Sequence, residues 1–319
     1  MNKKEKRCLY CYQPLPEGAT DFHERCSRKF FGNAVPPTLD YGNEQMQELA
    51  KEIVTRSVTV TGVQPKLSLT IEKTPGDPKH SRLTIVGLWG DYILKPPTET
   101  FPHLPENEDV TMHLSELFGI STAFHSLIRL QSGELAYITK RFDRTKDSKL
   151  AMEDMCQLTE TLTGDKYRSS VEKVGKHIAK FSTRPGLDNI NLFETTLFSF
   201  LTGNADMHLK NFSLLTTADN DIILSPAYDL VCTKIPMPED KDEMGLSING
   251  RKRKLRKNDF DVLAINLRIP EKTIQNSYER FAKNLPGALE LLDICFLPVA
   301  LKAQYKKIIV QNAQKLRMG

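Results

Sequence analysis

Residues 202–215, TGNADMHLKNFSLL, carry side chains whose types suit chemistry on phosphate and metal. Asp206, His208, Lys210 and Asn211 lie close together, immediately ahead of an apolar run. A solvated loop can also carry such residues. A site for a divalent cation and a transferring phosphoryl group would use all four, because carboxylate and carboxamide oxygens suit Mg(II) and cations neutralise phosphate charge.

A further carboxylate follows a predicted pair of short apolar strands around the turn Thr216–Asn220. In protein kinases a catalytic Asp accepts the hydroxyl proton, an Asn about five positions later holds Mg(II), and another Asp after a strand pair holds Mg(II) again. Here Asp206 and Asn211 are separated by five positions, and Asp229 follows the hairpin. The order and spacing therefore indicate phosphoryl transfer.

Candidate nucleotide-binding residues precede this loop. Lys95 ends a predicted strand and could reach the α- and β-phosphates of ATP. The helix predicted over 105–120 places Glu106 in its apolar stripe and Glu108 on the opposite face. We therefore expect Glu106 to point inward and restrain the Lys95 ammonium. Backbone N–H groups that would cover the phosphates come from a predicted turn, Thr61, Gly62, Val63 and Gln64.

Each of these residues also has a structural interpretation. Lys95 stands before two prolines and could be a solvated strand end. Gly62 could be an ordinary hairpin glycine, since the G-x-G-x-x-G of protein kinases is absent. Glu106 could be a carboxylate favoured by the helix macrodipole at an N-terminus.

A cysteine-rich segment lies near the start of the chain, CLYCYQPLPEGATDFHERC. Cys8 and Cys11 form a pair with two intervening residues, and His23 and Cys26 form a second such pair. Two ligand pairs on two short turns suit a tetrahedral, closed structural Zn(II) site with three thiolates and one imidazole. The alternative is a chance pair of free thiols beside an exposed His23.

Length and composition favour a cytoplasmic protein of two lobes. The 319 residues exceed the roughly 250 to 300 at which one core stops growing. Charged residues make up 26%, and no apolar run approaches a membrane span, so no membrane partner is expected. The basic N-terminus lacks the apolar stretch of a secretion signal. A net charge of +4 is too mild to indicate nucleic-acid binding by itself.

Patterning predicts an α+β fold with a β-rich first part and a helical second part. A helix is predicted at 43–54. Strands are predicted at 57–60, 66–71, 81–86, 91–95, 123–130 and 135–142. Amphipathic helices are predicted at 153–162, 170–181, 192–203, 270–283 and 298–315. The predicted phosphate-binding turn and the strand lysine lie in the β-rich part, and the loop with Asp206 and Asn211 lies in the helical part. This order indicates a bilobal, protein-kinase-like architecture.

Seven collinear stretches resemble the HipA-like serine/threonine kinases, which are toxins of bacterial type II toxin–antitoxin modules. The matching stretches are VTGVQPK at 60–66, ILKPP at 93–97, LPENE at 104–108, KRFDR at 140–144, EDMCQL at 153–158, GNADMHLKNFS at 203–213 and SPAYDLV at 225–231. Seven matches in the right order are far more specific than any one of them.

The resemblance implies roles for the residues of the loop and the hairpin. Asp206 would be the catalytic base. Asn211 and Asp229 would bind Mg(II). His208 and Lys210 would support the catalytic loop.

The resemblance also implies how ATP is held. Lys95 would bind the ATP phosphates, and Gln64 and Lys66 would complete the phosphate loop. The KRFDR stretch matches the hinge between the lobes of the family, so the backbone of Lys140 and Phe142 is expected to meet adenine.

The chain looks like the short, HipT-like toxin type of the family. About 55 residues precede the phosphate loop, where full-length members carry an extra subdomain. In the short type that subdomain is a separate small antitoxin and a third protein binds DNA, so direct DNA binding by this chain is not expected. The predicted domains are a zinc knuckle at 1–33, which is not part of the general family pattern, an N-lobe at 34–139, a hinge at 140–144 and a helical C-lobe at 145–319.

Short toxins of this type carry two hydroxyl residues ahead of the phosphate-loop glycine that can be autophosphorylated. Ser57 and Thr59 match them and lie two positions apart, on one face of a predicted strand. A phosphate there would add ~1.5 to 2 negative charges beside the ATP phosphates and repel nucleotide or displace the loop. The alternative is two ordinary strand residues.

Six basic residues gather in NGRKRKLRK at 249–257. Such a run is usually a solvated face, and otherwise it could dock an acidic or RNA-bound protein. Family members phosphorylate aminoacyl-tRNA synthetases, which is a compatible substrate class. The rival functions are an aminoglycoside-type small-molecule kinase and a non-catalytic DNA-binding regulator built on the knuckle and the basic run.

Overall fold

The computed structural model describes residues 6–56, 66–74, 76–86, 89–145 and 148–318. The chain forms two compact units. The first unit consists of Met1–Asp109, Ala123–Phe142 and Ile294–Phe296, and the second of Val110–Thr122, Asp143–Asp293 and Leu297–Gly319. The predicted limits 34–139 and 145–319 stay predictions.

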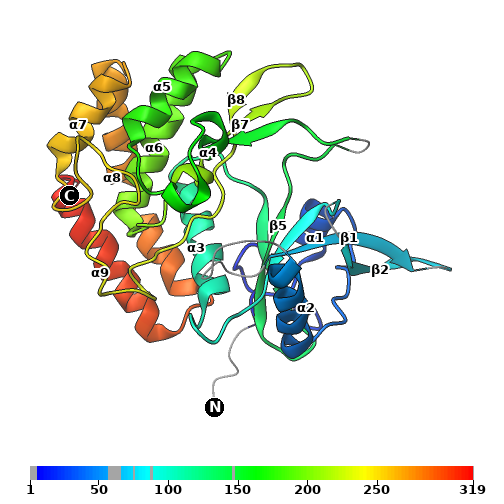
Figure 1. The fold of residues 1–319 in the computed structure, drawn as a ribbon. Coiled ribbons are helices and arrows are strands. Elements are labelled where there is room, and N and C mark those ends of the chain that lie inside the picture. Colours follow the sequence, from blue (N-terminus) through cyan, green and yellow to red (C-terminus); the bar gives the residue numbers. More distant parts are fainter. Residues whose placement is uncertain (1–5, 57–65, 75, 87–88, 146–147, 319) are drawn as a thin grey trace. The chain divides into compact units, whose positions relative to one another are not determined.

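An antiparallel sheet forms the frame of the first unit (Figure 1). Among the described residues its strand order is β2-β1-β3-β5-β4. The strands are β1 (Leu67–Thr74), β2 (Asp77–Val86), β3 (Tyr92–Lys95), β4 (His125–Arg129) and β5 (Leu135–Lys140). Lys95 therefore ends the central strand, where it pairs with Tyr137 of β5.

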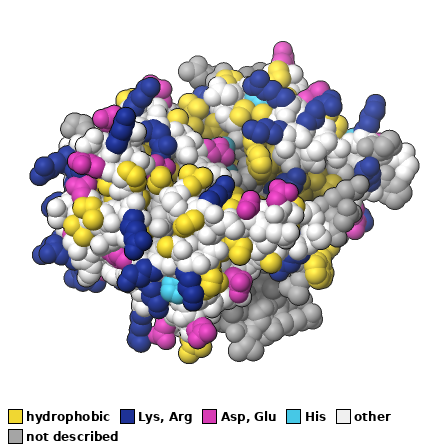
Figure 2. All heavy atoms as spheres, turned by 90° about the horizontal axis from the view of Figure 1, so that it is seen from above, with side chains coloured by type: hydrophobic (Ala, Val, Ile, Leu, Met, Phe, Trp, Pro, Cys, Tyr) yellow, Lys and Arg dark blue, Asp and Glu magenta, His cyan; other side chains and the backbone are white. Residues whose placement is uncertain are grey.

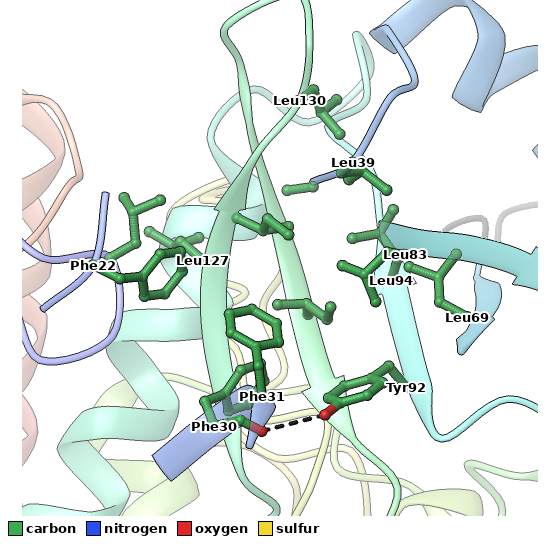
Figure 3. Packing of buried hydrophobic residues seen from close by; sticks show 14 of the residues in the cluster. Phe22, Phe30, Phe31, Leu39, Leu69, Leu83, Tyr92, Leu94, Leu127 and Leu130 are labelled. Carbon is green, nitrogen blue, oxygen red and sulfur yellow. Dashed lines mark hydrogen bonds between the residues drawn. The ribbon is translucent and has the colours of Figure 1, made fainter. Parts of the chain in front are cut away.

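The N-terminal helix α1 (Glu24–Phe31) packs its aromatic residues against the sheet (Figure 3). The ring centroids of Phe30 and Phe31 lie 4.7 Å apart, and that of Phe30 lies 5.8 Å from that of Tyr92 on β3. The helix ends at Gly32, whose positive φ of 82° is a conformation that costs glycine little. Leucines of β1, β2 and β3 complete the same core.

Two further helices follow, α2 (Asn43–Arg56) and α3 (Leu104–Leu117). Met46 of α2 is fully buried in the core of the first unit. In α3, six consecutive residues from Asn107 to Met112 are buried, so this helix is enclosed on every side over that stretch.

Helices dominate the second unit (Figure 1). They are α4 (Met155–Leu158), α5 (Val171–Phe181), α6 (Pro185–Thr202), α7 (Lys257–Asn266), α8 (Glu271–Ile294) and α9 (Val299–Lys315). The most enclosed is α6, whose residues 192–202 are all buried while it contacts α5, α7 and α9. No helix in the described ranges has both the length and the apolar character needed to cross a bilayer.

A small sheet in the second unit joins β6 (Met152–Asp154), β7 (Ser213–Thr216) and β8 (Ile222–Leu224). The hairpin of β7 and β8 is the strand pair predicted from the apolar runs around the turn at 216–220. It directly follows the short helical turn Leu209–Asn211. The hairpin therefore fixes where the candidate loop ends.

The α+β class is confirmed, but one predicted helix is wrong. Residues 153–162 do not form one helix, because β6 pairs with β7 and α4 begins only at Met155. Asp154 makes this boundary: its carboxylate accepts the Gln157 backbone N–H at 3.0 Å, and the Gln157 side chain accepts the Asp154 N–H at 2.9 Å. This reciprocal capping box starts the helix two residues later than its apolar periodicity suggests.

Candidate active site

The loop that carries Asp206 begins where α6 ends at Gly203. Its φ of 71° is left-handed, and a Cβ there would meet the side chain of Ile308 at 2.9 Å. Thr233 then holds the loop backbone: its hydroxyl donates to the Gly203 carbonyl at 3.1 Å and accepts the Ala205 N–H at 2.9 Å. The Asp206 N–H donates to the Asn204 side chain at 3.1 Å. Hydrogen bonds from Thr233 and Asn204 therefore hold the loop backbone in place around Asp206.

Asp206 presents its carboxylate at the surface of the second unit, with a side chain 43% exposed. The hydroxyl of Tyr167 donates to this carboxylate. His208 lies behind it, with Nε2 4.0 Å from Asp206 Oδ1. A carboxylate that is accessible yet held by a hydrogen bond can accept a proton from an incoming hydroxyl.

The environment of Asp206 also shifts the protonation of its neighbours. Burial lowers the pKa of His208 to about 4, against the opposing influence of the Asp206 and Asp229 carboxylates. Burial, followed by the charge of Asp206, raises the pKa of Tyr167 well above its ordinary value. At neutral pH the pair around Asp206 is therefore a neutral imidazole and a neutral phenol.

Replacing His208 with glutamine is expected to remove a pH-dependent loss of stability. Below about pH 6.5 the unfolded chain protonates this imidazole, while the folded chain keeps it neutral until about 4. Stability thus falls as pH drops through this window, by about 2 kcal/mol at pH 5. Urea denaturation at about pH 7.5 and pH 5 measures the difference. His177→Gln, on the outer face of α5, is the control, and an unchanged pH dependence in His208→Gln would contradict the assignment.

The two predicted magnesium ligands lie on either side of the β7–β8 hairpin. Asn211 is buried, and its side-chain nitrogen donates to the Asp206 carbonyl at 3.4 Å, so its carboxamide oxygen is the atom that could meet a cation. Asp229 is half-buried and has a left-handed backbone, with φ 57°. The preceding residue, Tyr228, donates its hydroxyl to the Lys210 carbonyl at 2.9 Å, which keeps Asp229 next to the loop of Asp206 and Asn211.

The contacts of Lys210 indicate that it supports the structure of this loop. Its Nζ lies 3.4 Å from the carboxylate of Asp154, the capping residue of α4. Its carbonyl accepts the Tyr228 hydroxyl at 2.9 Å, and that hydroxyl also lies 2.6 Å from Ser213 Oγ. These contacts tie the loop to the segment that carries Asp229.

Sequence reasoning missed two residues that shape this site, Tyr167 and Gly245. A Cβ at Gly245 would lie 2.7 Å from the Met207 carbonyl oxygen and 2.9 Å from that of Ala205, so only glycine lets the two backbones approach. A cavity of about 170 Å³ adjoins them and is lined by Tyr167, Ala205, Asp206, Met237, Asp240, Asp242, Gly245 and Lys252. Neither residue lies in a recognisable motif, and only their positions in the folded chain reveal them.

In the first unit Lys95 forms a buried ion pair with Glu108. The two side chains are 5% and 3% exposed. The ammonium also lies 5.2 Å from the ring centroid of Tyr137, its neighbour across the sheet. A buried lysine held by a carboxylate from a helix is the arrangement in which protein kinases bind ATP phosphates.

The prediction that Glu106 restrains Lys95 is wrong, since Glu108 does so. Glu106 lies in the first turn of α3, where its carboxylate is 3.1 Å from His103 Nδ1. The apolar stripe could not distinguish the two glutamates, because α3 is buried on every side around Glu108.

The predicted phosphate loop and autophosphorylation residues precede β1. Ser57, Thr59, Thr61, Gly62, Val63 and Gln64 lie outside the described residues. Lys66 is exposed directly before β1. Lys140 ends β5, and its N–H donates to the Phe124 carbonyl at 2.8 Å, while Phe142 is half-buried two residues on.

The four predicted zinc ligands come together in the first unit. The sulfur atoms of Cys8, Cys11 and Cys26 and a ring nitrogen of His23 all lie within 4.8 Å of one another. These donor atoms suit one tetrahedral metal ion.

Comparison with known proteins places residues 58–289 in the family described as the HipA-like C-terminal domain. The chain is 32% identical to the protein Y4dM of Sinorhizobium fredii over 74% of this chain and 62% of Y4dM. It is 24% identical to the serine/threonine-protein kinase toxin HipA of Shewanella oneidensis over 81% of this chain and 64% of HipA. The chain thus spans less than two thirds of the length of either relative.

Two solved structures share the fold. HipA of Shewanella oneidensis, solved with HipB and operator DNA, superposes with a TM-score of 0.65 at 21% identity, covering 84% of this chain and 71% of HipA. The proinflammatory kinase CtkA of Helicobacter pylori gives a TM-score of 0.53 at 16% identity, covering 77% of this chain and 92% of CtkA.

Proposed function

The chain belongs to the HipA-like family, and from this premise we propose that it is an ATP- and Mg(II)-dependent serine/threonine protein kinase. The observation that carries the proposal is the loop of the second unit. It presents the Asp206 carboxylate, bonds Asn211 to its own backbone and is joined to the segment of Asp229 by the hydrogen bond from Tyr228 to the Lys210 carbonyl. This combination matches the base and the two metal ligands that phosphoryl transfer requires.

In the proposed reaction a serine or threonine hydroxyl attacks the γ-phosphorus of ATP. The bond from that phosphorus to the β–γ bridging oxygen breaks, ADP leaves, and Asp206 takes the hydroxyl proton. Asn211 and Asp229 would hold Mg(II), which supplies neutralisation of the phosphate charge. Lys95, oriented by Glu108, binds the phosphates.

The remaining predicted contacts with ATP are part of the same proposal. The backbone of Lys140 and Phe142 meets adenine. The phosphate loop consists of Thr61, Gly62, Val63, Gln64 and Lys66, and autophosphorylation falls on Ser57 or Thr59.

The proposed cellular role is that of a toxin that inhibits growth by phosphorylating a translation-related protein of the aminoacyl-tRNA synthetase class. Its proposed partners are a small antitoxin and a DNA-binding antitoxin. The support is family membership and the HipA relative of Shewanella oneidensis, which was solved with HipB and operator DNA.

The basic run at 249–257 offers little support for a DNA-binding regulator. Lys252 donates to the Tyr167 carbonyl at 2.8 Å, Arg253 pairs with Asp242 at 2.5 Å, and Lys257 pairs with Asp261 at 2.8 Å. Much of the run is therefore engaged within the unit. Basic and acidic side chains are also interspersed on the face that Figure 2 shows.

The cavity beside Asp206 is the feature that favours the small-molecule alternative. Asp240 and Asp242 line it and would attract a cationic acceptor. Asp206 lines it as well, and Lys252 together with the pair between Arg253 and Asp242 offsets only part of this negative charge. A protein acceptor is proposed because the chain belongs to the HipA-like family and resembles the serine/threonine-protein kinase toxin HipA of Shewanella oneidensis.

Incubation with γ-labelled ATP, Mg(II) and cell extract tests the proposal. We expect a labelled protein band that is absent with Asp206→Asn. A labelled small molecule would transfer the assignment to the aminoglycoside-type alternative. No label in any fraction, with ATP binding intact, would exclude a kinase.

A further inference from the structure

The cysteine-rich turns of the first unit bring four donor atoms to spacings that one metal ion can bridge. His23 Nδ1 lies 3.4 Å from Cys11 Sγ and 3.7 Å from Cys26 Sγ. In a tetrahedral site with Zn–S about 2.3 Å and Zn–N about 2.0 to 2.1 Å, neighbouring sulfur and nitrogen ligands are about 3.6 Å apart. The observed spacings are therefore those of ligands that share one ion.

Local structure explains why the ligands converge. The Tyr12 N–H donates to the Cys8 carbonyl at 2.9 Å, which closes a tight turn between the first two cysteines. His23 is the N-cap of α1, and its side chain caps no backbone amide there. The first turn of α1 brings Cys26 back beside it, since the Cys26 N–H donates to the His23 carbonyl at 3.0 Å.

The hydrogen bond of His23 Nε2 determines which ring nitrogen can offer a lone pair to the sulfur atoms. Nε2 lies 2.9 Å from the Pro14 carbonyl oxygen, which can only accept, so Nε2 carries the proton. In a neutral imidazole Nδ1 then offers its lone pair to the sulfur cluster. A carbonyl that orients a histidine in this way is the usual outer partner of a metal-bound imidazole.

We propose that Cys8, Cys11, His23 and Cys26 bind one Zn(II) ion. We propose further that the zinc-bound turn of Cys8 and Cys11 supports the Lys95–Glu108 ion pair through Tyr12. Four protein ligands close the coordination sphere, so the metal has a structural role. The zinc site does not depend on the kinase assignment, because its ligands lie apart from Asp206 on the chain.

Tyr12, next to the ligand Cys11, connects the metal turn to α3. Its fully buried hydroxyl donates to Asp109 Oδ2 at 2.5 Å. Asp109 Oδ1 lies 2.7 Å from His125 Nδ1 on β4, and Asp109 directly follows Glu108. Movement of the turn would therefore pull on the residue beside the ion pair.

A second connection runs from α1 to the strand that carries Lys95. The Tyr92 hydroxyl donates to the Phe30 carbonyl at 3.3 Å, as the dashed line in Figure 3 shows. Tyr92 begins β3 and Lys95 ends it. The two metal-binding segments thus brace the ion pair from two sides within the first unit: α1, with Cys26, contacts the strand of Lys95, and the turn of Cys8 and Cys11 contacts the residue beside Glu108 through Tyr12.

Metal analysis of the purified full chain tests the site. We expect one Zn(II) per chain, and Co(II) substitution is expected to give the visible d–d and thiolate charge-transfer bands of tetrahedral thiolate coordination. Cys8→Ser is expected to weaken Zn(II) binding by more than roughly 100-fold, since losing even an outer partner costs 10- to 100-fold. Cys156→Ser, a buried cysteine of the second unit, should keep its zinc.

Chelator titration of the wild-type chain keeps the test decisive if Cys8→Ser does not fold. Zinc-free preparations that keep the same hydrogen exchange and stability, or Co(II) spectra without thiolate bands, would overturn the metal site. A disulfide among the three cysteines in the freshly purified, folded chain would do so as well.

The Tyr12→Phe variant separates the proposed support of the Lys95–Glu108 ion pair from zinc binding itself. This variant should keep one Zn(II) per chain but lose the bond to Asp109, so backbone amides of residues 104–109 should exchange with deuterium at least several-fold faster. Exchange in α6 should not change. Equal protection of 104–109 in wild type and Tyr12→Phe would overturn the connection while leaving the zinc site standing.

Discussion

Asp206→Asn is expected to lower phosphoryl transfer by roughly 10² to 10⁴-fold, the usual contribution of a general base. Asparagine is isosteric, and its side-chain oxygen can still accept from the Tyr167 hydroxyl that now bonds to Asp206. The loop should therefore keep its geometry and the chain should still bind ATP. Single-turnover transfer from labelled ATP, with nucleotide affinity measured separately, distinguishes lost chemistry from lost binding.

Asp219→Asn provides the matched control for this experiment. Asp219 is exposed on the turn between β7 and β8, and the substitution removes the same charge from the same unit. Its transfer rate should equal that of the wild type. If Asp206→Asn transferred phosphate as fast as Asp219→Asn, Asp206 would not be the base.

Lys95→Met is expected to abolish transfer and to lower the free energy of unfolding by about 3 to 5 kcal/mol. The stability loss arises because Glu108 would keep a buried charge without this partner, and leaving one half of a buried ion pair costs about that much. The double change Lys95→Met with Glu108→Gln should recover most of the stability and none of the activity. Urea denaturation and labelled transfer measure the two effects.

Glu106→Gln and Glu108→Gln distinguish the two glutamates of α3. The same substitution is made two positions apart in one helix. Only Glu108→Gln should reduce stability and ATP-dependent transfer strongly, because Glu106 contacts His103 near the surface. Equal effects of both variants would show that the ion pair has no special role.

Those glutamates also show where sequence reasoning was sufficient and where it was not. The spacing from Asp206 to Asn211 predicted a shared loop because residues so close in sequence cannot separate far in space. The choice between Glu106 and Glu108 depended on which side of α3 is covered, and α3 is enclosed all round at Glu108. Periodicity carries no information when a helix has no solvent face.

Contacts between distant segments were the hardest to predict. Tyr167 and Gly245 reach Asp206 and Met207 from tens of residues away, and neither residue belongs to a motif. The helix start at 185–191 was not predicted, because its first residues are Pro185 and Gly186, which are typical of turns, and residues 185–187 are exposed and carry no apolar stripe. The zinc ligands, in contrast, were recognised from two local pairs, which the turn at Tyr12 and the start of α1 bring together.

The approach of Gly245 to the loop has a mechanical consequence. The carbonyl groups of Ala205 and Met207 leave no room for even a methyl group at that position. Any displacement of the loop toward Gly245 must therefore carry the surrounding segment along with it. Asp206 and the segment around Gly245, which both line the cavity, are therefore expected to move together. The conformational change needed to admit a bulky acceptor must then come from another segment of the chain.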